Sequence, residues 1–234
     1  MQQDHRSIVA AGVLALGLVI AAAMVAGAVG GLAERDRVVE VKGFAERLVD
    51  ADLAVWPIKY SVGADTLEDL RALLDRADAS VTAFLKLHGF DDEEITRNPP
   101  WVNDRWLNVY DNQRPSQRYL AERTITLRSN KVGAVREAMS QAADLLDQGI
   151  ALMQDWSGQG EFVFTSLESI KPEMIAEATA DARQAAAQFA ADSGSEVGAI
   201  RRARQGFFSI EDRDSSSPHV KKVRVVTTIE YALE

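Results

Sequence analysis

The stretch from Ile8 to Leu32 contains no charged and no strongly polar residue, and charged residues stand on both sides of it. As a helix at about 1.5 Å per residue, this stretch extends roughly 37 Å. That length exceeds the roughly 30 Å hydrocarbon core of a bilayer. Because a helix satisfies its own backbone polar groups in lipid, the sequence predicts a single transmembrane anchor over residues 8–32.

A cleaved signal peptide is the alternative for this stretch, because the small residues at 21–23 and 26–28 resemble a cleavage site. The stretch is longer than the about 7–15 apolar residues of a signal h-region, which favours an anchor or an uncleaved signal. We expect a short cytoplasmic tail over 1–7, a linker over 33–37 and one extracytoplasmic domain over 38–234. Gly27 and Gly31 form a small-xxx-small pair at which two such helices can approach each other.

Composition excludes several classes of function. The net charge is -9, so the chain repels nucleic acid phosphates, and we expect no nucleic acid partner. The chain has no cysteine, which excludes disulfides, thiolate catalysis and cysteine-ligated zinc. A hydrophobic content of 47% is sufficient for a folded core beyond the anchor.

Residues 38–234 alternate between strand and helix patterns. Apolar residues at every second position predict strands over 38–62 (two strands), 105–110, 119–129, 161–167, 199–210 and 222–233. Apolar residues at three-and-four spacing predict helices over 66–88, 131–148 and 172–193. This order indicates an α+β domain, an antiparallel sheet with about three helices packed on it.

The third helix is expected to place Pro172 in its first turn, where proline is tolerated. Its core-facing stripe is expected to comprise Ile175, Ala178, Ala182, Ala185 and Phe189.

Four stretches, in order along the chain, resemble the SIMPL-domain family. The first is Val39-Glu-Val-Lys-Gly-Phe-Ala-Glu-Arg47 followed by Ala51-Asp-Leu-Ala-Val-Trp-Pro57, and the second is Asn112-Gln-Arg-Pro115 followed by Arg118–Glu122 and Thr124–Ser129. The third is Ala180-Asp-Ala-Arg-Gln-Ala-Ala-Ala187 with Ser193-Gly194, and the fourth is Lys221-Lys-Val-Arg-Val-Val-Thr-Thr-Ile-Glu-Tyr231. Each motif is degenerate, and their shared order carries the resemblance.

The resemblance implies a bacterial periplasmic or membrane-anchored protein of α+β fold that assembles into oligomers. Family members are linked to oxidative-stress defence, and the family supplies no catalytic residue to transfer. With the anchor over 8–32, the chain is expected to be a single-pass protein of the bacterial inner membrane with its C-terminal domain in the periplasm.

Residues for catalysis or metal binding are sparse. The three histidines show no metal-ligand spacing, and His88 near Asp91 and Asp92 is best interpreted as a helix-end histidine beside a solvated loop. Asp212 and Asp214 stand in a polar turn close to His219, where acidic residues are common. We therefore predict no catalytic residue, no metal ligand and no cofactor.

Residues 98–118 interleave aromatic and basic side chains, which are favoured anchors at binding surfaces. The candidate ligand or interface residues are Trp101, Arg105, Trp106, Tyr110 and Arg114. Two alternatives stay open for them: a small apolar cluster packed under a long connection, or a subunit contact.

These observations lead to three hypotheses. The first is a non-enzymatic, membrane-anchored, oligomeric envelope protein with a scaffolding or stress-protective role. The second is a periplasmic module that binds glycan or peptide through residues 98–118. The third is a hydrolase or lyase whose site the sequence does not reveal.

Overall fold

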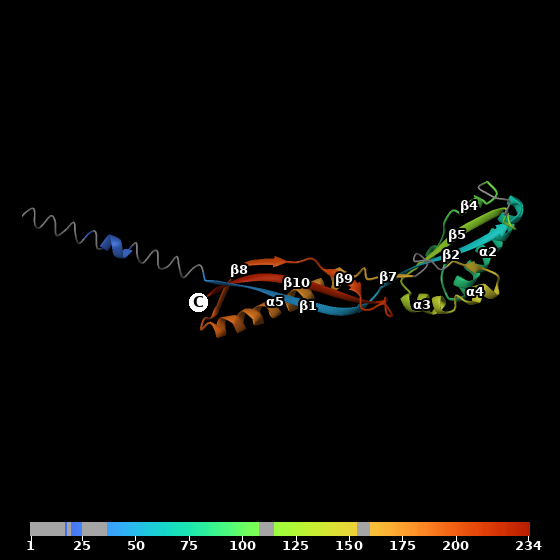
Figure 1. Ribbon diagram of the computed structural model, residues 1–234. Coiled ribbons are helices and arrows are strands. Elements are labelled where there is room, and N and C mark those ends of the chain that lie inside the picture. The colour runs from blue at the N-terminus through green and yellow to red at the C-terminus, as the bar shows by residue number, and fades with distance from the viewer. Residues whose placement is uncertain (1–16, 18–19, 25–36, 108–114, 154–159) are drawn as a thin grey trace, which may run out of the picture. The chain divides into compact units, whose positions relative to one another are not determined.

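The computed structural model describes the chain except for residues 1–16, 18–19, 25–36, 108–114 and 154–159 (Figure 1). The chain forms two compact units. Unit 1 comprises Met1–Glu46, Lys171–Ser209 and Arg224–Glu234, and unit 2 comprises Arg47–Ile170 and Ile210–Val223. Both units combine helices with an antiparallel sheet, which confirms the predicted α+β class.

The sheet that lies mainly in unit 1 has the strand order β1-β10-β8, and β9, most of whose residues are assigned to unit 2, also pairs with β10. The strands are β1 (Val38–Asp50), β8 (Val197–Gln205), β9 (Ser209–Asp212) and β10 (Val220–Leu233). Buried and exposed residues alternate along β1 and β10. One face of these two strands is therefore buried, and α5 (Leu167–Asp192) packs against it (Figure 1).

Helix α5 approaches β1 closely at Gly43. A Cβ atom on this glycine would lie 2.0 Å from the carbonyl oxygen of Ala178 and 2.3 Å from the backbone nitrogen of Ala182. No side chain fits between two backbones at that separation, so the helix–strand contact requires glycine at this position.

The buried face of α5 recurs every fourth residue, at Met174, Ala178, Ala182, Ala186 and Ala190. The predicted stripe is correct at Ala178 and Ala182 and wrong at Phe189, which is 59% exposed. The physical reason is the close approach at Gly43, because alanines fit against a nearby strand and a phenylalanine does not.

Helix α5 begins at Leu167, before the predicted start, so Pro172 lies inside the helix and not in its first turn. The residues just before the helix are bound by Asp52, whose carboxylate accepts from the backbone N–H of Thr165 at 2.7 Å and of Ser166 at 2.9 Å. These bonds come from a residue far away in sequence, which a local helix-start pattern does not include.

The sheet of unit 2 is built around the pair β2 (Leu53–Ala64) and β5 (Tyr119–Ser129), whose register runs unbroken from Ala54 opposite Ser129 to Ala64 opposite Tyr119. Two short strands, β3 (Ile95–Arg97) and β4 (Trp101–Asp104), lie along the outer edge of β5. Two others, β6 (Ala151–Leu152) and β7 (Glu161–Val163), lie along β2. Pro57 falls between the segments of β2 that pair with β6 and β7, where its missing N–H removes no bond to either strand.

Three α-helices and a 3-10 turn complete the described part of unit 2: α2 (Leu67–Leu87), η1 (Asp92–Glu94), α3 (Val132–Ser140) and α4 (Asp144–Asp147). The Thr66 side chain caps α2 by accepting from the N–H of Asp69. The apolar faces of β2, β5 and α2 form the main core, in which Tyr60, Leu85, Ile125 and Leu127 are fully buried. The helix predicted over 131–148 is divided into α3 and α4 by a turn.

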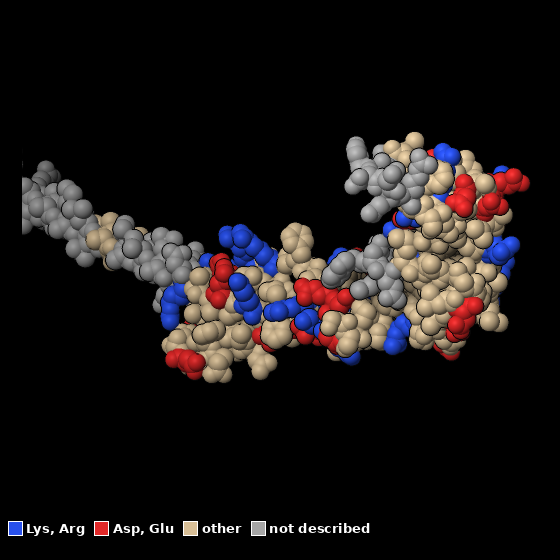
Figure 2. Space-filling view, turned by 45° about the vertical axis from the view of Figure 1, so that its right-hand side comes forward, with Lys and Arg blue, Asp and Glu red and all other residues tan. Residues whose placement is uncertain are grey.

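The expectation of one sheet with about three helices is wrong in detail, because the described residues form two sheets. The reason is strand pairing: β1 and β2 are consecutive in sequence, yet β1 pairs with β10 and β2 pairs with β5. Acidic and basic side chains are interspersed on the visible face of unit 1 (Figure 2).

Among the residues that the structure describes, none of the helices combines the length and the apolar character needed to cross a membrane. Most of the predicted anchor over 8–32, including Gly27 and Gly31, lies outside those residues.

Candidate functional site

Strand β4 and the turn after it expose four large apolar side chains in unit 2. Trp101 is 57% exposed and Leu107 is 78% exposed, and Val102 and Trp106 are also exposed. Trp101 pairs in register with Glu122 of β5, and Val102 pairs with Ala121. The described part of the aromatic segment therefore lies at the surface of unit 2.

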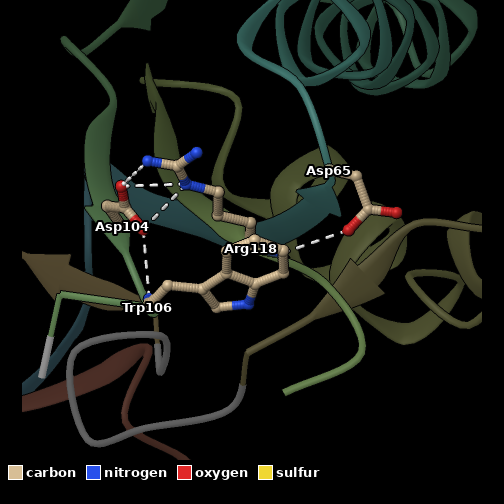
Figure 3. Close-up of polar contacts among 4 residues, drawn as sticks. All are labelled: Asp65, Asp104, Trp106 and Arg118. Carbon is tan, nitrogen blue, oxygen red and sulfur yellow. Dashed lines mark hydrogen bonds and ion pairs between the residues drawn. The ribbon is translucent and has the colours of Figure 1, made fainter. Parts of the chain in front are cut away.

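Strands β4 and β5 form a hairpin, which we call the aromatic hairpin. A bidentate ion pair lies at the point where β4 ends and β5 begins (Figure 3). The guanidinium of Arg118 donates to the carboxylate of Asp104 from Nε at 3.1 Å and from Nη2 at 2.8 Å. Asp104 also accepts from the backbone N–H of Trp106 at 3.0 Å. The hydrogen bonds from Arg118 lower the pKa of Asp104, and the same pair raises the pKa of Arg118. Both groups are ionised at neutral pH, and their opposite charges cancel, so the pair adds no net charge to the aromatic surface.

The same arginine contacts two aromatic rings. Its guanidinium carbon lies 5.4 Å from the Trp106 ring centroid and 4.8 Å from the Tyr119 ring centroid. The Arg118 backbone N–H donates to Asp65 at 3.3 Å, and the indole N–H of Trp106 donates to the Pro115 carbonyl at 3.3 Å. Trp106 is therefore held in place from two sides, whereas Trp101 projects from β4.

The structure describes three of the five predicted candidates, Trp101, Arg105 and Trp106, all in or directly after β4. Arg105 is half-buried, and its backbone N–H donates to the carbonyl of Arg118 at 2.7 Å. Tyr110 and Arg114 lie outside the described residues. Arg118, which organises the hairpin, was not among the candidates, although it stands directly before the strand pattern that begins at Tyr119.

A second feature of unit 2 is a hollow of about 540 Å³ between α2 and the pair α3–α4. It is lined by Ala83, Phe84, Leu87, His88, Glu137, Gln141, Asp144 and Gln148. Nδ1 of His88 lies 2.8 Å from the Phe84 carbonyl oxygen, and Nε2 lies 3.2 Å from the amide oxygen of Gln141. The volume is within the range of small-molecule sites, and the two carboxylates in the lining favour a cationic occupant.

Metal chemistry finds no support at His88, because the neighbouring carboxylates bind lysines. Asp92 pairs with Lys86 at 2.8 Å, and Asp91 lies 3.6 Å from Lys131. Within the described ranges there is no group of three His, Cys, Asp or Glu side chains arranged to hold a metal ion.

A polar cluster is buried between α2 and the sheet of unit 2. The Tyr60 hydroxyl donates to Asp78, and Arg123, directly opposite Tyr60 in the ladder, donates to the same carboxylate at 2.5 Å. Burial, followed by the hydrogen bond to Asp78, raises the pKa of Tyr60 well above its usual 10. The cluster has no open approach for a ligand, since Tyr60 is fully buried and both charged side chains are mostly buried.

The acidic turn before β10 is held by its own bonds. Asp212 pairs with Lys221, and Asp214 accepts from the hydroxyls of Ser216 and Ser217 and from Arg213. Hydrogen bonds from Ser216, Ser217 and Arg213 lower the pKa of Asp214 far below its usual value. These contacts describe a well-ordered turn, in which the carboxylates are occupied by neighbouring side chains.

Two antiparallel sheets, each with helices against it, and an exposed aromatic hairpin in unit 2 define the chain as a two-unit α+β protein. The chain belongs to the SIMPL family: the family model described as "SIMPL: Protein of unknown function (DUF541)" matches residues 39–229. A comparison with curated proteins gave no match.

Three of the four stretches that resembled this family in sequence lie wholly or partly in unit 1, and the second includes β5 of unit 2. The first contains Gly43, against which α5 packs, and the third contains Asp181 and Ala182 on the facing helix. The fourth forms β10, the central strand of the unit 1 sheet. The first and third stretches therefore contain residues at which α5 contacts β1.

Proposed function

We propose that this chain is a membrane-anchored scaffold protein of the bacterial cell envelope, that it acts as an oligomer and that it catalyses no reaction. The observation that carries the proposal is the uncharged run 8–32, which ends six residues before β1 begins at Val38. With such a short connection, unit 1 stands close to the membrane surface. The family resemblance adds to this proposal a protective role under oxidative stress.

Single-cysteine labelling tests the anchoring and its orientation, because the chain has no cysteine of its own. Gln3→Cys reports on the N-terminal tail, and Ser215→Cys reports on an exposed position of the folded part. In cells with a permeabilised outer membrane, a membrane-impermeant maleimide should label Ser215→Cys and should label Gln3→Cys only after lysis. Both variants should stay in the membrane pellet after alkaline carbonate extraction; release into the supernatant contradicts the anchor.

Oligomerisation is tested by light scattering of the full-length protein in detergent. The expected result is a single defined mass above that of one chain. A matched variant, Gly27→Leu with Gly31→Leu, removes the small residues proposed for helix contact. A reduced mass in this variant would mean that the anchor helices hold the oligomer together. An unchanged mass would mean that contacts between the folded units do so. A monomeric wild type rejects the scaffold proposal.

A second candidate function is binding of glycan or peptide at the aromatic hairpin, and the exposed Trp101 and Leu107 favour it. β4 is an outer strand of its sheet, so a peptide has access to backbone groups as well as to the rings. The informative variant is Trp101→Ala, because Trp106 is held by hydrogen bonds and Trp101 is not needed for the core.

Trp101→Ala should abolish binding to a panel of peptidoglycan fragments and extended peptides while the melting temperature stays within about 2 °C, as expected for an exposed side chain. Val55→Ala, a half-buried position away from the hairpin, is the control for a general effect on folding. Binding that survives Trp101→Ala removes the hairpin as the site.

A further inference from the structure

The outer edge of β8 in unit 1 is open. Among the described residues, β10 is the only strand that pairs with β8, and every residue from Ala199 to Gln205 is exposed. Figure 2 shows basic side chains gathered on the side of unit 1 along which β8 runs in Figure 1. An open edge presents backbone N–H and C=O groups, so β8 is where a further strand can join this sheet.

The register of β8 limits how much of this edge is regular. Pairing with β10 is continuous from Gln205 opposite Thr227 to Arg202 opposite Glu230, and the next pair joins Ile200 to Tyr231. Arg201 is therefore the extra residue of a β-bulge, which bends the strand there. The regular edge spans Arg202–Gln205, a length that accommodates about four residues of an added strand.

The backbone groups that face outward on this edge follow from one hydrogen bond. Gly206 donates its N–H to the carbonyl of Val226 at 2.8 Å, so the backbone N–H of Gly206 points toward β10. Because the direction alternates along an antiparallel ladder, Ala203 and Gln205 present their N–H and C=O groups to the open side.

Two arginines give this edge a positive charge. Arg202 and Arg204 lie on the sheet face opposite α5, beside Lys42 of β1. Within the part of the chain that the structure describes, neither guanidinium takes part in a hydrogen bond or ion pair. Arginines on an edge disfavour a second copy of β8 through like-charge repulsion and attract a carboxylate-bearing strand.

The hollow on this face is small, and both acidic and basic side chains line it. The hollow formed by Glu40, Lys42, Arg202, Arg204, Thr228 and Glu230 has a volume of about 170 Å³. Small-molecule sites usually start at about 300 Å³, so the hollow is small for one. Phe207, two residues after β8, is fully exposed and offers an apolar contact at the end of the edge.

We propose that the edge of β8 from Arg202 to Gln205 binds a short, extended, acidic peptide segment as an additional strand of the unit 1 sheet. The outward backbone groups of Ala203 and Gln205 bond to the peptide backbone, Arg202 and Arg204 pair with its carboxylates, and Phe207 contacts an apolar residue beyond them. Backbone bonding supplies affinity and the arginines supply selectivity. This site is in unit 1 and is independent of the anchor and of the aromatic hairpin.

The test uses the full-length protein in detergent and a dye-labelled peptide of alternating glutamate and valine residues, with binding followed by fluorescence anisotropy. Arg202→Glu with Arg204→Glu should weaken binding at least about tenfold, as expected for loss of two charge-assisted contacts. The control, Arg136→Glu with Arg183→Glu, makes the same change in net charge at two exposed helical positions and should leave affinity within about twofold. A peptide with lysine in place of glutamate should not bind.

Strand addition is separated from simple anion binding by two further measurements. Ala203→Pro removes an outward N–H and keeps both arginines, so it should weaken binding of the glutamate peptide by about fivefold or more. In the wild type, hydrogen exchange of the Ala203 and Gln205 amides should slow when the peptide binds, a readout that holds even where the proline variant does not fold. Unchanged exchange at these amides, equal binding of the lysine peptide, or equal weakening by the control variant overturns the proposal.

Discussion

The backbone N–H of Phe44 in β1 donates a 3.0 Å hydrogen bond to Oδ2 of Asp181 in α5. This bond occupies a donor on the outer edge of β1, so a side chain of the packed helix covers part of that edge. The two edges of the unit 1 sheet therefore differ: β1 is partly closed by α5, and β8 is open along its regular segment.

Gly43→Ala should destabilise the protein strongly. The added methyl group would lie 2.0 Å from a carbonyl oxygen and 2.3 Å from a backbone nitrogen of α5, and neither atom belongs to a flexible side chain. We expect a loss of about 3 kcal/mol in the free energy of unfolding, at the upper end of overpacking effects. Urea unfolding followed by circular dichroism measures it.

Gly133→Ala is the matched control for that variant. Gly133 lies in α3, and a Cβ atom added there would have no other atom within 4 Å. The same substitution should there be neutral or stabilise by up to about 1 kcal/mol, because alanine is the better helix former. Equal losses at the two glycines would contradict the close approach of α5 to β1.

Two tyrosine-to-phenylalanine variants should differ in their effect on the free energy of unfolding. Tyr60→Phe removes a buried donor to Asp78 and should cost about 1–3 kcal/mol. Tyr231 is also fully buried, but its hydroxyl has no partner among the described residues, so Tyr231→Phe should be neutral or stabilising. Thermal unfolding of the two variants beside the wild type makes the comparison, and a large loss for Tyr231→Phe would reveal an unrecognised partner.

Tyr60 should also make the protein sensitive to alkali. Its pKa is raised in the folded state, so the folded protein holds this proton more tightly than the unfolded chain does. The resulting stability is fully present below pH 10 and decreases as the pH rises beyond it. Urea midpoints between pH 8 and pH 11 should fall more steeply for the wild type than for Tyr60→Phe, and parallel curves would contradict the assignment.

Asp52→Asn should remove a contribution to the free energy of unfolding that is present at neutral pH and lost in acid. Burial raises the pKa of Asp52, but hydrogen bonds from Ser166 and Thr165 outweigh it and lower the pKa below the usual 3.8. A depressed pKa adds stability above pH 3.8 that is lost as the pH falls through the folded-state value. The free energy of unfolding of the wild type should exceed that of the variant by about 1 kcal/mol at pH 7, the usual net contribution of a hydrogen bond, and the difference should shrink below pH 3.8.

Arg118→Lys should loosen the aromatic hairpin without unfolding unit 2. Lysine keeps the charge but cannot form the bidentate contact with Asp104 or stack over the rings of Trp106 and Tyr119. We expect faster hydrogen exchange at the amide of Trp106, which is bonded to Asp104, and an unchanged melting temperature. Arg128→Lys, at an exposed position of β5, the strand that begins just after Arg118, is the control and should leave exchange at Trp106 as it is.

Local patterns in the sequence were sufficient to predict most elements of the fold. Alternation along 38–62 and 222–233 and helical spacing over 66–88 correspond to β1, β2, β10 and α2. Alternation identifies which face of a strand is buried, but it carries no information about the neighbouring strand. The separation into two sheets depends on β1 pairing with β10 and β2 pairing with β5, and these partners are far apart in sequence.

The candidate site was predictable in part for the same reason. Trp101 and Trp106 were recognisable as binding anchors by residue type and spacing. The role of Arg118 depends on the ladder between β4 and β5, which places it beside Asp104 across a connection that includes residues outside the described ranges. The bulge at Arg201 and the regular segment after it emerge only from the register of β8 with β10.

Unit 1 is assembled from three separate stretches of the chain, and this has a consequence for biogenesis. Its central strand β10 leaves the ribosome or a translocation channel after β1 and β8, its two neighbours in the sheet, whereas β1 leaves first. Unit 2 holds most of its residues in the single stretch Arg47–Ile170, so its sheet can form while the chain is still emerging. During that interval β1 lacks its partner and exposes an unpaired strand, which makes the nascent chain dependent on rapid completion or on a chaperone until β10 arrives.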